Sequence, residues 1–396
     1  MNDAASNFEV TAAGRIERIP REEWDALLAP DDSPFLEWDW LFAMEHSGSA
    51  APETGWTPCH LVVRGGSRKQ IVAACPLYLK THSMGEFVFD HGWADAAEGA
   101  GIRYYPKLLA GVPFTPHTGR RFLTAPGGDR AALIEIIVRS LDAIRKEHKL
   151  SGVHVNFCEP DEAAALAQLG YIERLGYQYH WRNAGYASFD DYLGQLKHKR
   201  RAAIRHERAA IASAGIEVRA IAGEEIPDRM FPEMFRIYLS TIEKLYWGRQ
   251  YLTAEFFEIL RERFKRNLCL IGAYDGHELI AGAICVEKAG VLYGRYWGCF
   301  REVRFLHFDV CYYAGIEHCI ARGMNRFEPG AGGEYKWLRG FDPALTRSAH
   351  LIAEPRLRRA IAAAVARERI EVEGLIAAGP RISQLKHPPP SDREAR

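Results

Sequence analysis

The chain lacks the short signatures by which many enzymes and metalloproteins are recognised. It contains no Walker A loop, no glycine-rich dinucleotide fingerprint and no Gly-x-Ser-x-Gly elbow. Its eight cysteines include no Cys-x-x-Cys pair, and most of them lie in apolar runs where cysteine behaves as a small hydrophobic residue. The sequence therefore predicts no metal site and no disulfide framework.

Net charge and long apolar runs are also lacking. Lys plus Arg and Asp plus Glu both total 51, so the formal net charge is zero, which disfavours a nucleic-acid coat protein or a polybasic membrane binder. The apolar runs fall short of the roughly 18 to 20 residues that cross a bilayer. The opening residues, MNDAASNFEV, lack the basic and apolar regions of a secretory signal. We therefore expect a cytoplasmic protein without a transmembrane segment.

What the sequence does contain is a repeated order of elements. Three strands, a helix and a further strand are expected in residues 59–158 and again in residues 268–328. In the first set the third strand is expected at 86–91 and the helix at 129–148. The last three elements of the second set are a strand at 291–297, a helix at 307–322 and a strand at 325–328. With 396 residues, two domains are favoured over one. The pattern predicts a duplicated lobe in which α-helices and mixed β-sheets combine.

A basic helix is expected between the two halves, over residues 189–214. Ser188, followed three residues later by Asp191, forms a capping-box pattern at its start. The expected organisation along the chain is a first lobe in residues 1–185, the inter-lobe basic helix in 186–215, a second lobe in 216–352, a C-terminal helix in 353–386 and a disordered tail in 387–396.

Several ordered stretches resemble the FemAB-like predicted N-acyltransferases of the GNAT superfamily, which are often described as peptidoglycan biosynthesis or recognition proteins. They are SPFLEWDW, GEFVFDHGWADA, YYPKLLAGVPFTP, HKRRAAIRHER, LYGRYWGC, LHFDVCYY and FEPGAGGEYKWLRGF. The resemblance spans roughly residues 33–350. The chain departs from the expected pattern at Gly332 and Tyr335, near which a Gln and a His are expected.

The resemblance implies two tandem GNAT-like acyl-CoA N-acyltransferase lobes. It also implies an enzyme that moves an acyl or aminoacyl group from acyl-CoA or aminoacyl-tRNA to an amine on a peptide or a cell-wall precursor. No tightly bound cofactor is implied. The alternative is a non-catalytic GNAT-like module that recognises an anionic ligand such as a peptidoglycan precursor. The lack of an Arg/Gln-x-x-Gly-x-Gly phosphate loop favours this alternative and leaves the donor open.

The GNAT-like interpretation places the donor beside the strand at 291–297, whose backbone groups would pair with the donor arm. Tyr296, Trp297 and Gly298, at the end of this strand, are the candidate donor-binding residues, and Arg339 is an auxiliary cation. Ordinary packing of strand aromatics in a core explains the same residues.

Four side chains are candidate catalytic groups. Glu328 is a carboxylate on a short apolar strand, where a charge must be paired or functional. Through the resemblance, Lys336 is expected to steady negative charge on a phosphate or an oxyanion. His307 or Asp309 would accept the proton of the amine, although helix capping is the favoured explanation of both. We expect these four groups and the aromatics of the 291–297 strand to bound one cleft.

Two further surfaces are candidates for binding. Acidic and aromatic residues at 90–95 suit a cationic amine acceptor, although an ordinary polar loop is the alternative; they are Asp90, His91, Trp93 and Asp95. Basic residues on one face of the inter-lobe helix suit an anion such as tRNA phosphate, a nucleotide-diphosphate sugar or a lipid-linked precursor, although a solvated face is the alternative; they are Lys197, Arg201, Arg205 and Arg208.

Overall fold

The computed structural model describes residues 8–244 and 249–388. The chain forms two compact units, which we call the N-terminal unit and the C-terminal unit. The N-terminal unit comprises Met1–Gly176 with Thr346–Val372, and the C-terminal unit comprises Tyr177–Leu345 with Glu373–Arg396. Among the described residues, no helix combines the length and the apolar composition that a bilayer crossing requires.

The N-terminal unit is built on two groups of strands. One is an antiparallel sheet in the order β1-β3-β4-β7, and the other has the order β15-β8-β6-β5-β2, in which only β6 and β8 run parallel. These strands are β1 (Phe8–Ala13), β2 (Trp56–Pro58), β3 (His60–Gly65), β4 (Gln70–Cys75), β5 (Leu77–Lys80), β6 (Lys107–Ala110), β7 (Leu123–Thr124), β8 (Gly152–Asn156) and β15 (Asp342–Ile352).

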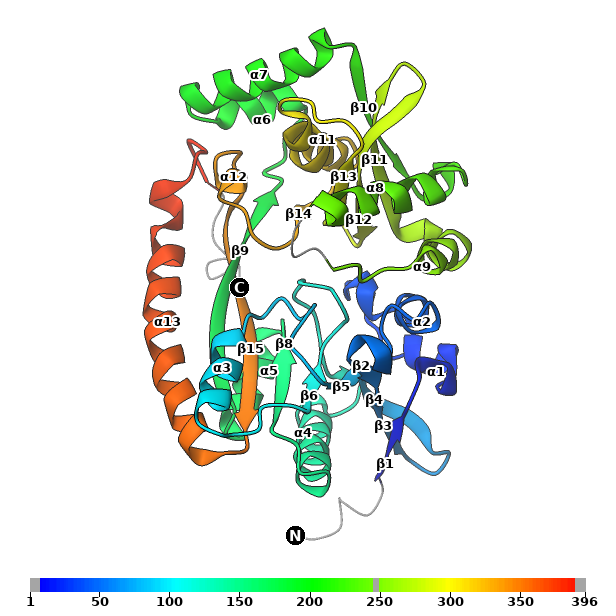
Figure 1. Ribbon diagram of the computed structural model, residues 1–396, viewed down its shortest axis with the longest axis vertical. Helices are drawn as coiled ribbons and strands as arrows, with labels where there is room; N and C mark the ends of the chain where they lie inside the picture. Colours follow the sequence, from blue (N-terminus) through cyan, green and yellow to red (C-terminus); the bar gives the residue numbers. More distant parts are fainter. Residues whose placement is uncertain (1–7, 245–248, 389–396) are drawn as a thin grey trace. The chain divides into compact units, whose positions relative to one another are not determined.

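Helix α4 shows how the core of the N-terminal unit forms. Asp129 caps its first turn by accepting a hydrogen bond from the Ala132 backbone N–H (3.1 Å). Its apolar stripe, which includes Ile137, is buried with the residues of β6 and β8, beside which it lies (Figure 1). The helices of this unit are α1 (Arg21–Asp25), α2 (Trp38–His46), α3 (His91–Gly99), α4 (Arg130–Glu147), α5 (Pro160–Gln168) and the first part of α13 (Pro355–Ile382).

The C-terminal unit contains a mixed sheet in the order β10-β11-β12-β13-β14-β9. All neighbours are antiparallel except β13 and β14, which run parallel and are joined through a helix. These strands are β9 (Ile172–Arg182), which begins in the N-terminal unit, β10 (Ile216–Ala222), β11 (Leu268–Asp275), β12 (Glu278–Lys288), β13 (Val291–Cys299) and β14 (Arg326–Glu328).

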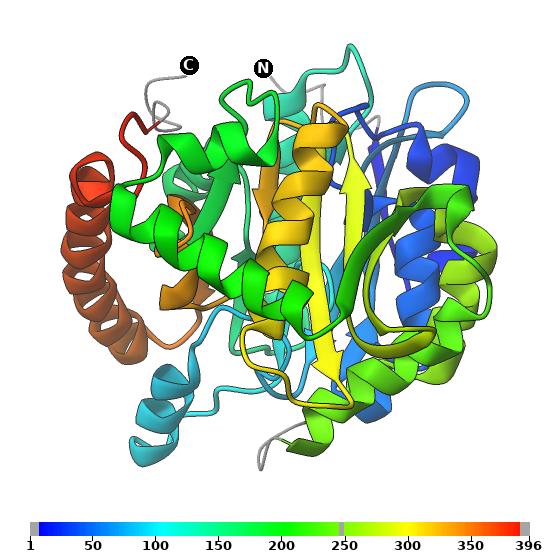
Figure 2. The ribbon, with the colours of Figure 1, turned by 90° about the horizontal axis from the view of Figure 1, so that it is seen from above.

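Helices cover both faces of this sheet. Helix α8 packs against one face, where Gly282 lies against Met234. Helix α11 covers the other, where Gly315 lies against the Phe327 ring. In Figure 2, α11 (gold) and α7 (green) lie over the same face of strands β12 and β13 (yellow). The helices are α6 (Phe189–Gln195), α7 (His198–Ser213), α8 (Met230–Lys244), α9 (Ala254–Ile259), α10 (Leu306–Phe308), a π-helical turn at Asp309–Tyr313, α11 (Ala314–Ala321) and α12 (Glu334–Trp337).

Two expected elements are wrong in detail. The basic helix at 189–214 breaks into α6 and α7, because Leu196 is extended and forms a β-bridge with Leu385. The third strand expected in the first half, at 86–91, is a loop that ends at Asp90, the residue before α3.

The compact units also differ from the expected lobes at their limits. Helix α7 lies within the C-terminal unit, whereas the sequence places it between two lobes. Residues 346–372 return to the N-terminal unit, so β15 and α13 each divide between the units. The expected tail at 387–396 lies outside the described residues from position 389 onward.

Candidate active site

The two central parallel strands of the C-terminal unit pair over a short stretch. They pair only where Val291–Tyr293 of β13 lies beside Arg326–Glu328 of β14. Strand β14 ends there, whereas β13 continues for six residues to Cys299. On α8, the Thr241 hydroxyl donates a hydrogen bond to the Trp297 carbonyl (2.6 Å), within this extension. Strand β13 thus extends beyond the end of β14, and the pairing of a donor arm with this extension stays a prediction.

His307 lies beside the extension of β13. Its ring is 4.8 Å from the Trp297 ring and 5.4 Å from the Tyr312 ring, edge to face in both cases. Burial, together with the positive charges of Arg339 and Lys336, lowers the pKa of His307 to about 4. His307 is therefore neutral at physiological pH and is a weak base.

Lys336, on α12, is a buried ammonium whose positive charge acts on His307. It is 3% exposed, and its Nζ donates hydrogen bonds to the carbonyls of Gly330 (2.5 Å) and Ala331 (3.1 Å). Burial lowers its pKa to about 8, an effect that the Cys311 thiol partly opposes. An ammonium has three N–H groups, so one remains available. No carboxylate of a described side chain forms an ion pair with Lys336, and this favours an anionic ligand there.

Arg339 lies three residues after Lys336, and its guanidinium is hydrogen-bonded to other groups of the protein. Its Nη2 forms hydrogen bonds of 3.0 and 2.9 Å with both carboxylate oxygens of Glu207, and its Nε donates to the Tyr313 hydroxyl (2.7 Å). Its Nη1 donates to the Tyr335 carbonyl (2.9 Å), and its guanidinium lies 3.5 Å from the centre of the Phe308 ring. These contacts hold the Arg339 guanidinium in place, and its donor-binding role stays a prediction.

The sequence analysis missed Glu207, the partner of Arg339. A signal was present, because Glu207 is the lone acid among the basic residues of α7. The nearby departure from the family pattern, Tyr335, is 58% exposed, with its ring 5.6 Å from the Phe308 ring. It adds an aromatic side chain at the surface of this site.

Glu328 does not join Lys336 in one cleft. Successive strand residues point to opposite faces, and the Phe327 ring packs on the α11 side, against Gly315. Glu328 therefore points to the other face, where its carboxylate pairs with Arg326 (2.8 Å) and lies 3.9 Å from the His180 ring nitrogen. The expectation of a single cleft that contains both Glu328 and Lys336 is not met.

Tyr296 and Gly298 also belong to the α8 side of the sheet. The Tyr296 ring is 5.1 Å from the Tyr238 ring of α8. A Cβ atom on Gly298 would lie 1.9 Å from the Ile237 carbonyl oxygen, so glycine is required there for α8 to approach β13. Of the three donor-binding candidates on β13, Trp297 is the one whose side chain contacts His307.

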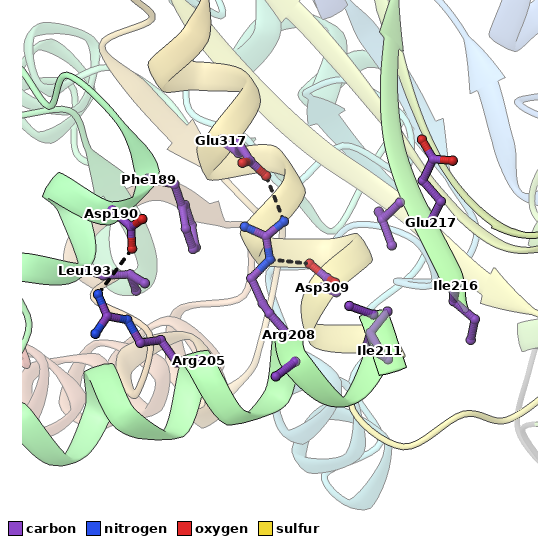
Figure 3. Close-up of a pocket in the computed structure, with 13 residues that line it drawn as sticks. Phe189, Asp190, Leu193, Arg205, Arg208, Ile211, Ile216, Glu217, Asp309 and Glu317 are labelled. Carbon is purple, nitrogen blue, oxygen red and sulfur yellow. Dashed lines mark hydrogen bonds and ion pairs between the residues drawn. The ribbon is translucent and has the colours of Figure 1, made fainter. Parts of the chain in front are cut away.

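Asp309 lines a separate groove of about 520 Å³ between α6, α7, β10 and the start of α11 (Figure 3). Figure 3 shows the Arg208 guanidinium between two carboxylates, 3.4 Å from that of Asp309 and 2.9 Å from that of Glu317. Burial raises the pKa of Asp309 to about 6, although the Arg208 charge opposes this effect.

The expected basic face is largely neutralised by neighbours. Arg205 pairs with Asp190 (3.2 Å) in the same groove, and Arg208 is paired as described. The Lys197 ammonium donates to the Ser383 carbonyl (2.6 Å). Arg201 is the one of the four whose side chain forms no hydrogen bond or ion pair with a described residue.

The four acceptor-binding candidates of the N-terminal unit face in different directions. Asp90 is buried and accepts hydrogen bonds from Lys107 (2.5 Å) and the Tyr104 hydroxyl (2.6 Å). Trp93 is also buried, with its ring 4.9 Å from the His350 ring. On the opposite side of α3, the last two candidates, His91 and Asp95, are exposed. These four residues thus form a buried anchor and a solvated face.

Known proteins share this architecture. A family model described as peptidoglycan biosynthesis/recognition, FemAB-like, matches residues 15–384. The structure is similar to FemX (13% identity, 87% of this chain and 98% of that chain, TM-score 0.52). It is also similar to L-PGS from Bacillus licheniformis (9% identity, 88% of this chain and 96% of that chain, TM-score 0.53). A third similar structure is a protein of unknown function from Bacteroides thetaiotaomicron (10% identity, 87% of this chain and 100% of that chain, TM-score 0.51). A comparison with curated proteins finds no match.

Proposed function

Because the chain belongs to the FemAB-like family and folds into tandem GNAT-like lobes, we propose that it is an N-acyltransferase. It moves an acyl or aminoacyl group from acyl-CoA or aminoacyl-tRNA to an amine acceptor. The observation that carries this proposal is the buried Lys336 ammonium beside neutral His307, next to the extension of β13 beyond β14.

The donor lies along the extension of β13 in this proposal. Its amide groups pair with the strand edge, as an added β-strand would. The reacting carbonyl or a phosphate of the donor accepts a hydrogen bond from the third N–H of Lys336, while the Trp297 ring forms an apolar wall. A hydrogen bond aimed at developing negative charge stabilises a transition state by about 3 kcal/mol.

The transfer forms one bond and breaks another. The acceptor nitrogen attacks the carbonyl carbon of the donor, and the carbon–sulfur bond of a thioester or the carbon–oxygen bond of an ester breaks. The attacking amine is neutral and loses one proton, and the leaving sulfur or oxygen gains one through solvent and departs as a thiol or a hydroxyl group. A general base works best with a pKa near the working pH, so His307, with a pKa of about 4, orients the reactants by hydrogen bonding instead.

The acceptor is an amine on a peptide or a cell-wall precursor. The family description, peptidoglycan biosynthesis/recognition, supports this class. The ion pairs of Arg205 and Arg208 leave Arg201 as the contact we propose for tRNA phosphate or an anionic lipid-linked precursor.

The test is a thermal-shift panel of acyl-CoAs, charged tRNAs and peptidoglycan precursors, followed by a transfer assay with each stabilising pair. A true ligand at a hundredfold its Kd stabilises the folded protein by roughly 2.7 kcal/mol. We expect Lys336→Met to lower the rate of transfer by about 10²–10³, as expected when one hydrogen-bond donor to the transition state is removed. The matched control is Lys199→Met, at an exposed position of α7. Wild-type turnover by the Lys336→Met variant would overturn the proposal.

A second candidate function is recognition without transfer. It is favoured by the segment Cys299-Phe300-Arg301-Glu302-Val303-Arg304 between β13 and α10, which contains no phosphate-binding glycine pattern. In that case a precursor stabilises the protein, but no donor does and no product forms.

A further inference from the structure

A second group of reactive side chains lies on the α11 side of the same sheet. Cys269 at the start of β11, Glu287 near the end of β12 and His318 on α11 each offer a ligand atom, and these three atoms lie within 4.8 Å of one another. Trp297 and His307 lie at the other ends of β13 and of the helix, so this group is distinct from the proposed active site.

We propose that Cys269, Glu287 and His318 bind a zinc ion. Thiolate, imidazole and carboxylate are the ligand types that zinc uses, and three protein ligands plus a water complete its tetrahedral shell. Each ligand comes from a different regular element, so the trio is held by the rigid part of the fold. The spacings of 17 and 30 intervening residues do not resemble a paired-ligand motif, which is why the sequence predicted no metal site.

The surroundings of the trio orient its ligand atoms. Arg322 lies 3.4 Å from one carboxylate oxygen of Glu287, while the other oxygen lies 2.7 Å from the His318 Nε2. The guanidinium thereby aims that second oxygen at His318. Such outer contacts commonly fix the geometry of metal ligands.

Charge balance also suits a divalent cation. The Cys269 side chain is fully buried. Zinc binding would replace the thiol proton, which is released to solvent, and form a sulfur–zinc bond. Two positive charges then meet one thiolate and one carboxylate. Neutrality within the first coordination shell limits the cost of burying the site.

The competing explanation is a hydrogen-bonded His318–Glu287 pair beside an inert thiol. The two are separated by titrating the full chain with Co²⁺, which replaces zinc and shows a thiolate-to-cobalt charge-transfer band in the near ultraviolet. We expect roughly one ion per chain, displacement by Zn²⁺, and a rise in Tm with Zn²⁺.

Three variants identify the ligands. Cys269→Ser removes the charge-transfer band, and His318→Gln, at a partly exposed position, weakens Co²⁺ binding by more than about tenfold while leaving the fold intact. Cys59→Ser, in the N-terminal unit, is the control and retains the band. A folded wild type that shows no band and no Zn²⁺-dependent rise in Tm would overturn the proposal, as would a band that survives in folded Cys269→Ser.

Discussion

Two of the buried lysines, Lys107 in the N-terminal unit and Lys336 in the C-terminal unit, show how partners decide what a buried charge does. Lys107, in the N-terminal unit, is 0% exposed and pairs with Asp90 (2.5 Å) and Glu86 (3.0 Å). Lys336, in the C-terminal unit, is 3% exposed and binds only backbone carbonyls among the described groups. Burial acts on both, but the two carboxylates keep the pKa of Lys107 above its ordinary value, whereas that of Lys336 falls to about 8.

The comparison separates a structural charge from a functional one. A paired buried charge is costly to break, because the partner is left uncompensated. An ammonium held by neutral carbonyls keeps part of its desolvation cost, which an anionic ligand can offset. We therefore assign Lys107 to the stability of its unit and Lys336 to ligand binding.

The largest expected effect is the loss of Lys107. In Lys107→Met, Asp90 and Glu86 are left buried without their cation, and the free energy of unfolding falls by about 3–5 kcal/mol. Denaturant titration measures it. Adding Asp90→Asn and Glu86→Gln to this variant should recover part of the loss. Unchanged stability in Lys107→Met would erase the distinction between the two lysines.

Lys336→Met should act on catalysis instead. Once a donor and an acceptor are identified, kcat and kcat/KM should fall together by about 10²–10³, because the interaction lost is one made in the transition state. Stability should change much less than in Lys107→Met, as the Tm will show. Equal losses of Tm in the two variants would make Lys336 another structural charge.

The two lysines should also give opposite responses to alkaline pH. Lys336 has a folded pKa of about 8, below its unfolded value, so the unfolded chain binds more protons between these two values and the Lys336 contribution to stability rises across that window. The folded pKa of Lys107 is raised, so its contribution is lost as the pH rises through that value. Urea titrations of wild type and Lys336→Met from pH 7 to 10 measure the free energy of unfolding at each pH. The rise with pH that Lys336 contributes should be absent from the variant.

The smallest effect concerns the basic residues of α7. Arg201 forms no ion pair with a described residue, whereas Arg205 pairs with Asp190. Arg201→Glu should weaken binding of an anionic ligand by less than about tenfold and change stability by under about 0.5 kcal/mol. Arg205→Glu serves as the paired comparison and should affect binding less. Equal affinities of both variants and wild type for the anionic ligand would mean that these basic residues are solvated and do not bind it.

Local patterns predicted the elements that depend on local physics. Strand 291–297 and helix 129–148 follow from residue alternation, apolar periodicity and capping, and the structure places β13 and α4 there. The break at Leu196 could not be predicted in this way, because its bridge partner, Leu385, lies far along the chain. The loop at 86–91 alternates like a strand, but its charged residues are drawn inward by Lys107, which lies on another element.

The residue types of the candidate site were determined by the sequence alone, and so was the family to which its motifs belong. The tertiary structure decided which of these residues meet. Alternation along β14 sends Glu328 away from α11, while the glycine-rich turn at 330–333 brings Lys336 back to the side of His307. The same packing supplies Arg339 and Arg208 with carboxylates from distant segments. The sequence does not show which charged residues form an ion pair, because pairing depends on distances that only the folded chain defines.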